Sequence, residues 1–89
     1  MKLVYFIQDS LGGEIRIGVA REGRLEKRLQ TLQLGNPNDL KLLGLIKARN
    51  ADTLARELHS TFSDAHVRGE WFKPEADLLS YIRSRASLR

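Results

Sequence analysis

Arginine side chains crowd the segment 15–29, which reads IRIGVAREGRLEKRL. Three of them are spaced so that they share one flank of a helix, because residues three or four apart stack on the same side. The planar guanidinium fork matches a phosphate group bidentately, so the segment indicates a phosphate-binding site. The alternative is a solvated helix flank on which the arginines pair with neighbouring glutamates. The three on one flank are Arg21, Arg24 and Arg28, and Arg16 precedes them on an expected strand.

Gly18 follows Arg16 on one face of an expected strand, and Ile15 and Ile17 occupy the other face. Because glycine has no side chain, it would let a phosphodiester backbone approach the end of this strand closely. The polar face of the strand is therefore free to serve a function.

Three other features have both a chemical and a structural interpretation. Tyr5 could act as a general base or orient a phosphate, but an aromatic residue in a short strand is more often part of the core. His59 can exchange a proton near neutral pH, whereas a lone histidine on a helix is more often structural. Trp71 and Phe72 could stack on a base, yet an adjacent aromatic pair before a helix more often closes the core. We expect core closure for this pair.

Apolar periodicity predicts the elements that must position these residues. Alternation over 14–20 is typical of a half-buried strand, and leucines at helical spacing after Gly23 indicate a helix that ends near Gly35. The basic tail after residue 84 is expected to fray. In chain order the patterns predict strands at 2–8 and 14–20, a helix to 35, a strand at 40–46, a helix at 50–63 and a helix from about 74.

Composition predicts one small domain with anionic partners. The 89 residues include 15 Lys and Arg against 11 Asp and Glu, for a formal net charge of +4. We expect a single domain over 1–84 and a basic C-terminal tail over 85–89. The absence of cysteine excludes disulfides and thiolate zinc sites. The opening residues lack an apolar signal segment and no run is long enough to span a membrane, so we expect an intracellular, cytoplasmic or nucleoid-associated protein without a membrane partner.

Six short motifs in this order resemble the GIY-YIG endonuclease superfamily. They are VYFI at 4–7, IRIG at 15–18, EKRL at 26–29, LGNP at 34–37, ELHSTF at 57–62 and VRGEWF at 67–72. Within it, the chain is most similar to a small stand-alone branch named for a meiotically up-regulated yeast protein. The resemblance implies a compact α+β fold with a three-stranded, mainly antiparallel sheet flanked by three helices.

The resemblance also implies roles for individual residues. Tyr5 matches a tyrosine beside the scissile phosphate, and Arg16 takes the place of the tyrosine in the second motif. Arg28 matches a helix arginine that steadies negative charge, and His59 matches a histidine that serves in the site. These four are the expected catalytic residues. The expected nucleic-acid-binding residues are Gly18, Arg21, Arg24, Lys27 and Arg68.

The metal ligand of the family is the one departure from its pattern. The resemblance places a glutamate for Mg²⁺ or Mn²⁺ four residues before His59, where this chain has Ala55. Alanine cannot ligate a hard cation, which needs oxygen donors. Glu57 is the nearest substitute, but two residues correspond to about 200° of helix rotation, so it lies on the opposite flank. Either Glu57 holds the metal or the carboxylate is missing.

Two functions follow as hypotheses. The first is a nuclease-like domain that binds DNA and hydrolyses phosphodiesters with a divalent metal and preorganised arginine charge. The alternative is a catalytically inactive nucleic-acid-binding or protein-interaction module on the same fold.

Overall fold

The computed structural model describes residues 1–88 and contains one antiparallel sheet with three α-helices, which confirms the α+β class. Two 3₁₀ turns, Glu22–Arg24 and Ser63–Ala65, precede α1 and β4. The strands are β1 (Lys2–Asp9), β2 (Ile15–Arg21), β3 (Leu40–Lys47), β4 (His66–Arg68) and β5 (Trp71–Phe72), and the helices are α1 (Leu25–Leu34), α2 (Ala51–Thr61) and α3 (Ala76–Arg85).

The sheet is wider than the three strands that were expected. Its five strands lie in the order β3-β1-β2-β5-β4, and β4 and β5 form a short hairpin that turns at Gly69 with φ of 52°. This hairpin pairs with β2 at Ile15 and Arg16, and the Ile17 amide donates a hydrogen bond of 3.0 Å to the Glu70 carbonyl oxygen. The outer edge of β2 beyond the Ile17 amide therefore stays open to other elements.

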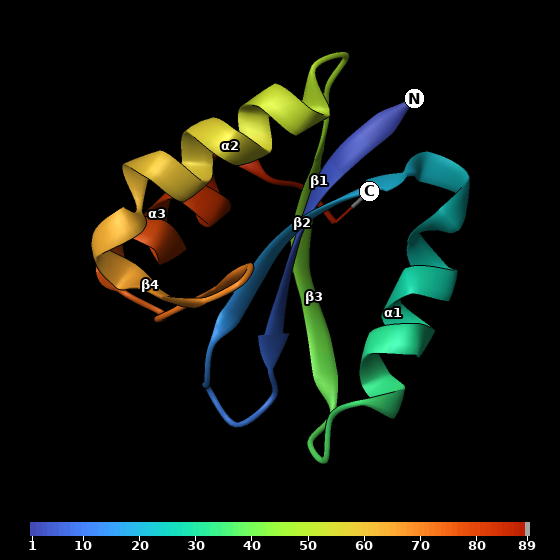
Figure 1. Cartoon of the computed structure of the whole chain (residues 1–89), viewed down its shortest axis with the longest axis vertical. Helices are drawn as coiled ribbons and strands as arrows, with labels where there is room; N and C mark the ends of the chain where they lie inside the picture. Colours follow the sequence, from blue (N-terminus) through green and yellow to red (C-terminus); the bar gives the residue numbers. More distant parts are fainter. Residues whose placement is uncertain (89) are drawn as a thin grey trace.

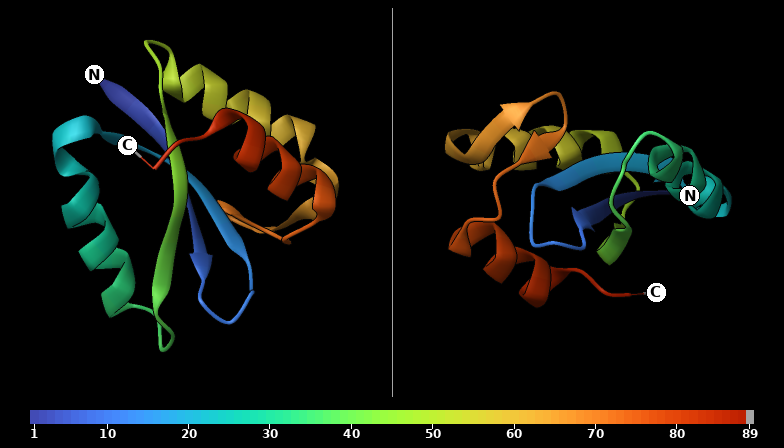
Figure 2. Two further views of the ribbon diagram at one scale, coloured as in Figure 1. Left: turned by 180° about the vertical axis from the view of Figure 1, so that it is seen from behind. Right: turned by 90° about the horizontal axis from the view of Figure 1, so that it is seen from below.

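The helices cover the two faces of the sheet unequally. Helix α1 lies on one face, and α2 and α3 lie on the other, as Figures 1 and 2 show. Ile15 and Ile17 of β2 are fully buried toward α2 and α3, as their alternation predicted. The intervening residues of β2 face the side of α1, where Ala20 joins a second core. This second face carries the polar residues of interest.

The C-terminal residues after α3 return to the sheet instead of fraying. Ser87 and Leu45 exchange two backbone hydrogen bonds, with N···O distances of 2.6 and 3.0 Å. The expectation of a frayed tail is therefore wrong as far as Ser87. The domain boundary at residue 84 stays a prediction.

No helix within residues 1–88 is long and apolar enough to cross a bilayer.

Candidate nucleic-acid interface

Four of the predicted cationic residues gather in one pocket along the start of α1. This α1 pocket has a volume of about 380 Å³ and is closed on its apolar side by Ala20. The predicted helical spacing of Arg21, Arg24 and Arg28 is wrong in detail, because Arg21 ends β2 and Arg24 lies in the 3₁₀ turn before α1. Lys27 and Arg28 lie in α1, and the turn from strand to helix brings the four cations together. The cations of the α1 pocket are Arg21, Arg24, Lys27 and Arg28.

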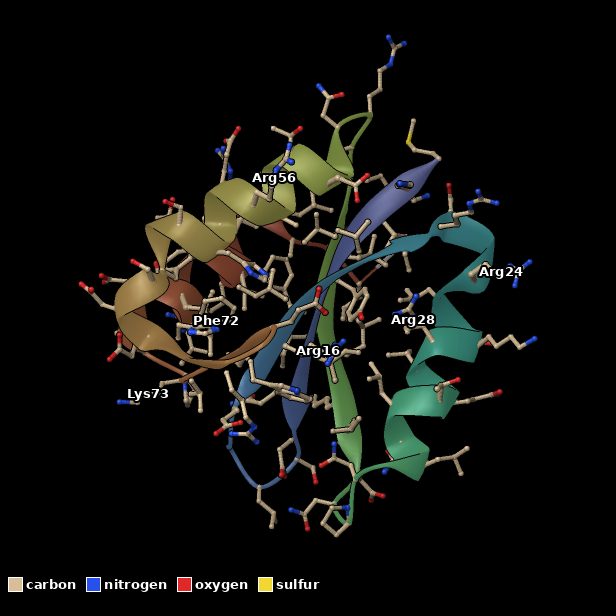
Figure 3. The ribbon with its side chains drawn as sticks, in the orientation of Figure 1. Arg16, Arg24, Arg28, Arg56, Phe72 and Lys73 are labelled. Atoms are coloured by element: carbon tan, nitrogen blue, oxygen red, sulfur yellow. The ribbon has the colours of Figure 1, made fainter. Side chains whose placement is uncertain are left out.

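A second pocket lies where α2 meets the open edge of β2. This α2 pocket has a volume of about 350 Å³ and shares Arg28 with the first. In Figure 3, Arg28 extends from α1 toward the sheet, and Arg16 lies on the same side of the sheet. The two pockets therefore form one continuous, mainly cationic surface. The residues of the α2 pocket are Val19, Arg28, Asp52, Ala55, Arg56, His59 and Glu70.

Helix geometry explains which side chains of α2 reach this pocket. At about 100° per residue, Asp52, Arg56 and His59 all fall within about 100° of Ala55 around the helix axis. Glu57 lies about 200° away and is exposed outside the pocket. The structure thus confirms the register that placed Ala55 and His59 on one flank.

Arg16 occupies the centre of a polar cluster on the face of the sheet that α1 covers. Its Nη2 lies 2.8 Å from Oε1 of Glu70, and its Nε donates a weak hydrogen bond of 3.4 Å to the Tyr5 hydroxyl. Its guanidinium carbon lies 5.6 Å from the ring centroid of Trp71. With its side chain only 20% exposed, Arg16 is held in place by all three contacts.

The expectation that Tyr5 reaches a phosphate must be corrected. Its side chain is fully buried and belongs to the core between the sheet and α1. A group sealed from water cannot take a proton from an attacking water or touch a phosphate. The structure supports the alternative interpretation, in which Tyr5 is a core aromatic residue.

Gly18 has a different role from the one expected, for the same reason. It lies directly opposite Tyr5 in the β1–β2 register. A Cβ at Gly18 would lie 2.4 Å from both Cζ and the hydroxyl oxygen of Tyr5, which is far inside van der Waals contact. Gly18 therefore makes room for the tyrosine ring and not for a phosphodiester.

His59 lines the α2 pocket and also caps the open edge of β2. Its Nε2 lies 3.0 Å from the carbonyl oxygen of Ile17. A carbonyl only accepts, so Nε2 carries a hydrogen and Nδ1 is the ring atom left to accept a proton. The ring also packs edge-on against Phe72, with centroids 4.8 Å apart. His59 thus stabilises the packing of α2 against β2 and β5 and also lines the α2 pocket.

The donors in the α2 pocket do not fit Mg²⁺ or Mn²⁺. Ala55 supplies no oxygen, and the expected substitute Glu57 is outside the pocket. The two carboxylates that are present face cations: Asp52 Oδ2 lies 2.7 Å from Lys2 Nζ, and Glu70 pairs with Arg16. Across residues 1–88, no three His, Asp or Glu side chains converge where they could hold a metal ion. The expectation that Glu57 is a metal ligand is therefore wrong.

Arg68 and Trp71 line a third pocket, which contains none of the lysines and arginines of the α1 and α2 pockets. Arg68 is 70% exposed and its Nη2 lies 3.3 Å from Oε1 of Glu14. The expected core closure holds only for Phe72, which is fully buried toward α2. Trp71 is half-buried and faces the opposite side, because successive residues of a strand point to opposite faces.

Two residues of the α2 pocket were given no site role by the sequence-based interpretation: Arg56 was not singled out, and Glu70 was named only as part of the VRGEWF motif. Arg56 lies three residues before His59 on the same flank, so the helical wheel that placed His59 also indicates Arg56. Glu70 enters the pocket from the turn of the β4–β5 hairpin, and no periodicity in the sequence predicts that hairpin.

Comparison with known proteins identifies the family of the chain but names no site residues. A family model described as the T5orf172 domain matches residues 2–87. Neither a search of curated proteins nor a search of solved structures found a match. The T5orf172 domain is of the GIY-YIG-like class, and it indicates a nuclease-like DNA-binding domain. Because the match spans nearly the whole chain, the chain belongs to the T5orf172 domain family.

Proposed function

We propose that the protein binds DNA by its phosphodiester backbone and does so without a divalent metal. The observation that carries the proposal is the pair of pockets that meet at Arg28. One holds Arg21, Arg24 and Lys27, and the other holds Arg56 and His59. Successive phosphates of one strand are the natural ligand for a row of cations on two neighbouring elements.

Electrostatics favours a polyanion over a single small anion at this surface. The cations are spread along α1 and across to α2, and the two pockets are open, so no enclosed cavity is present to desolvate one isolated phosphate. Each phosphate that a cation neutralises releases condensed counterions, which makes such binding strongly dependent on salt.

Metal-dependent hydrolysis of phosphodiesters is the alternative function, and the family supports it. The donor set of the α2 pocket argues against it, because the pocket contains Ala55 where the resemblance implies a carboxylate. We therefore assign phosphate binding to Arg28 and Arg56, and derive no step through a metal. Affiliation with the narrower branch is part of the proposal, and it is supported by His59 and Glu70, which come from two of its motifs and line one pocket.

The experiment that tests this proposal separates binding from cleavage. Fluorescence anisotropy with a labelled DNA duplex in EDTA should show binding that weakens steeply as salt rises. Incubation of supercoiled plasmid with the protein and Mg²⁺ or Mn²⁺ should leave it intact. Binding that requires Mg²⁺, or nicking that Mg²⁺ switches on, would contradict the proposal.

A further inference from the structure

Trp71 lines a third pocket that neither the family match nor the proposed function assigns. This Trp71 pocket has a volume of about 560 Å³ and lies between the β1–β2 hairpin loop and the loop that follows α1. Gly13 and Gly35 lie at its rim, so no side chains from these positions narrow its mouth. A pocket of this size can accept a flat ring of the size of a nucleobase.

The surroundings of Trp71 combine one aromatic surface with polar groups. The Arg16 guanidinium lies over the indole ring at cation–π distance. Asp9 and Asn36 line the same pocket. The Asp9 carboxylate accepts hydrogen bonds from the neighbouring loops, and the Asn36 amide is a group that pairs with the edges of bases. Aromatic rings stack on bases regardless of sequence, whereas polar side chains at the rim can discriminate among them.

The position of Arg16 links this pocket to the proposed phosphate surface. Glu70 lines the α2 pocket, Trp71 lines the Trp71 pocket, and these two residues are adjacent in the chain. The Arg16 side chain contacts both of them. A phosphate in the α2 pocket and a base in the Trp71 pocket would therefore lie on either side of Arg16, as the two parts of a nucleotide do.

We infer that the Trp71 pocket binds an unpaired nucleobase of a DNA strand whose phosphates lie on the cationic surface. The inference rests on the proposed DNA binding and specifies its substrate as a strand with accessible bases. A base inside a paired duplex is stacked between its neighbours and cannot enter such a pocket unless it leaves the stack.

The test uses the single tryptophan of the chain as its own probe. A short oligothymidylate should quench Trp71 fluorescence, and a strand of the same length made of abasic sites should not. The strand with bases should also bind about ten-fold more tightly than the abasic strand at equal salt. These measurements need no variant, so they do not depend on whether a substituted protein folds.

Two variants locate the effect. Trp71→Ala should abolish the roughly ten-fold preference for oligothymidylate over the abasic strand, whereas Trp71→Phe should keep most of this preference. Equal affinity of the wild-type protein for both strands, with salt-dependent binding intact, would overturn the inference alone. Absence of salt-dependent binding to either strand or to a duplex would overturn the proposed function as well.

Discussion

Gly18 shows how one residue type can carry two interpretations that only the packing separates. A glycine beside an arginine on a strand is compatible with a close approach of phosphate, but here the Tyr5 ring fills the space above it. The cross-strand pairing of Tyr5 with Gly18 explains both the burial of the tyrosine and the need for glycine. Neither residue alone indicates this arrangement in the sequence, because the register that joins them is a property of the folded sheet.

Replacement of Gly18 should therefore be costly for stability. Gly18→Ala places a methyl group against the tyrosine ring, and we expect a loss of about 3 kcal/mol in the free energy of unfolding, measured by urea denaturation. Gly23→Ala is the matched control, since a Cβ at Gly23 meets no atom within 4 Å. A Gly18→Ala protein as stable as the control would contradict the packing described for Tyr5.

Glu70 is the residue that holds Arg16 back from a ligand. Its carboxylate lies 2.8 Å from the Arg16 guanidinium, where the oxygen of a phosphate would otherwise bind, and it adds a negative charge to the α2 pocket. We expect Glu70→Gln to bind DNA several-fold more tightly at low salt, because the repulsion between the Glu70 carboxylate and the phosphates of DNA disappears.

The control for Glu70 keeps the change in net charge equal. Glu75→Gln removes one exposed carboxylate at the start of α3, away from the three pockets. If both variants gain affinity to the same extent in fluorescence anisotropy, net charge and not the Arg16–Glu70 pair controls binding.

At the scale of elements, the long elements could be predicted and the short hairpin could not. β1, β2 and β3 each have seven or eight residues, which is enough for an apolar run or an alternation to appear. β4 and β5 have three and two residues, so no periodicity can be detected in them. The consequence was large for the site, because this hairpin carries Glu70 and directs Trp71 to the face opposite Phe72.

The loops at one end of the sheet are joined by Asp9. Its carboxylate accepts hydrogen bonds of 2.9 Å from the Leu11 amide and from the Asn38 side chain, so it connects the β1–β2 loop to the segment before β3. The Leu11 amide, followed by Asn38, lowers the pKa of Asp9 below its ordinary value. Because the Trp71 pocket lies between these loops, Asp9 also maintains its shape.

This shift in pKa predicts how stability responds to acid. A carboxylate whose pKa is lower in the folded than in the unfolded state stabilises the fold above the unfolded pKa, and this contribution is lost as pH falls below about 4. Thermal unfolding at a series of pH values should show Asp9→Asn less stable than wild type near neutrality and less sensitive to acid.

The matched control for Asp9 is Asp39→Asn, which removes an exposed carboxylate from the neighbouring loop. This variant should follow the acid dependence of the wild-type protein. An Asp9→Asn protein that loses stability in acid as steeply as wild type would show that Asp9 does not stabilise these loops.

Across the whole molecule, the arrangement of the cations indicates a DNA-binding surface more clearly than the net charge does. The formal net charge of +4 is modest, yet six cations lie on or beside the surface formed by the two pockets that meet at Arg28. Helical spacing predicted three of them, Arg21, Arg24 and Arg28, but Arg21 ends β2 and Arg24 precedes α1, and the meeting of these cations with α2 depends on how the helices pack across the sheet. These cations are Arg16, Arg21, Arg24, Lys27, Arg28 and Arg56.

The hypothesis that Ala55 stands where the family has a metal-binding glutamate can be tested by the substitution Ala55→Glu. Ala55→Glu adds a negative charge among the phosphate-binding cations, so we expect weaker DNA binding in EDTA, by about ten-fold, and partial recovery when Mn²⁺ is added. The control Ser60→Glu places the same charge farther round α2, on an exposed position outside the pocket. A response to Mn²⁺ that is the same in both variants would contradict the assignment of Ala55.

If a phosphodiester backbone lies across the two pockets that meet at Arg28, the salt dependence of DNA binding must change when Arg28 loses its charge. The slope of log Kd against log salt should be smaller by about 0.9 for Arg28→Gln than for the wild-type protein. Arg83→Gln, on α3 at the other face of the sheet, should keep the wild-type slope. Equal slopes for all three proteins would contradict the claim.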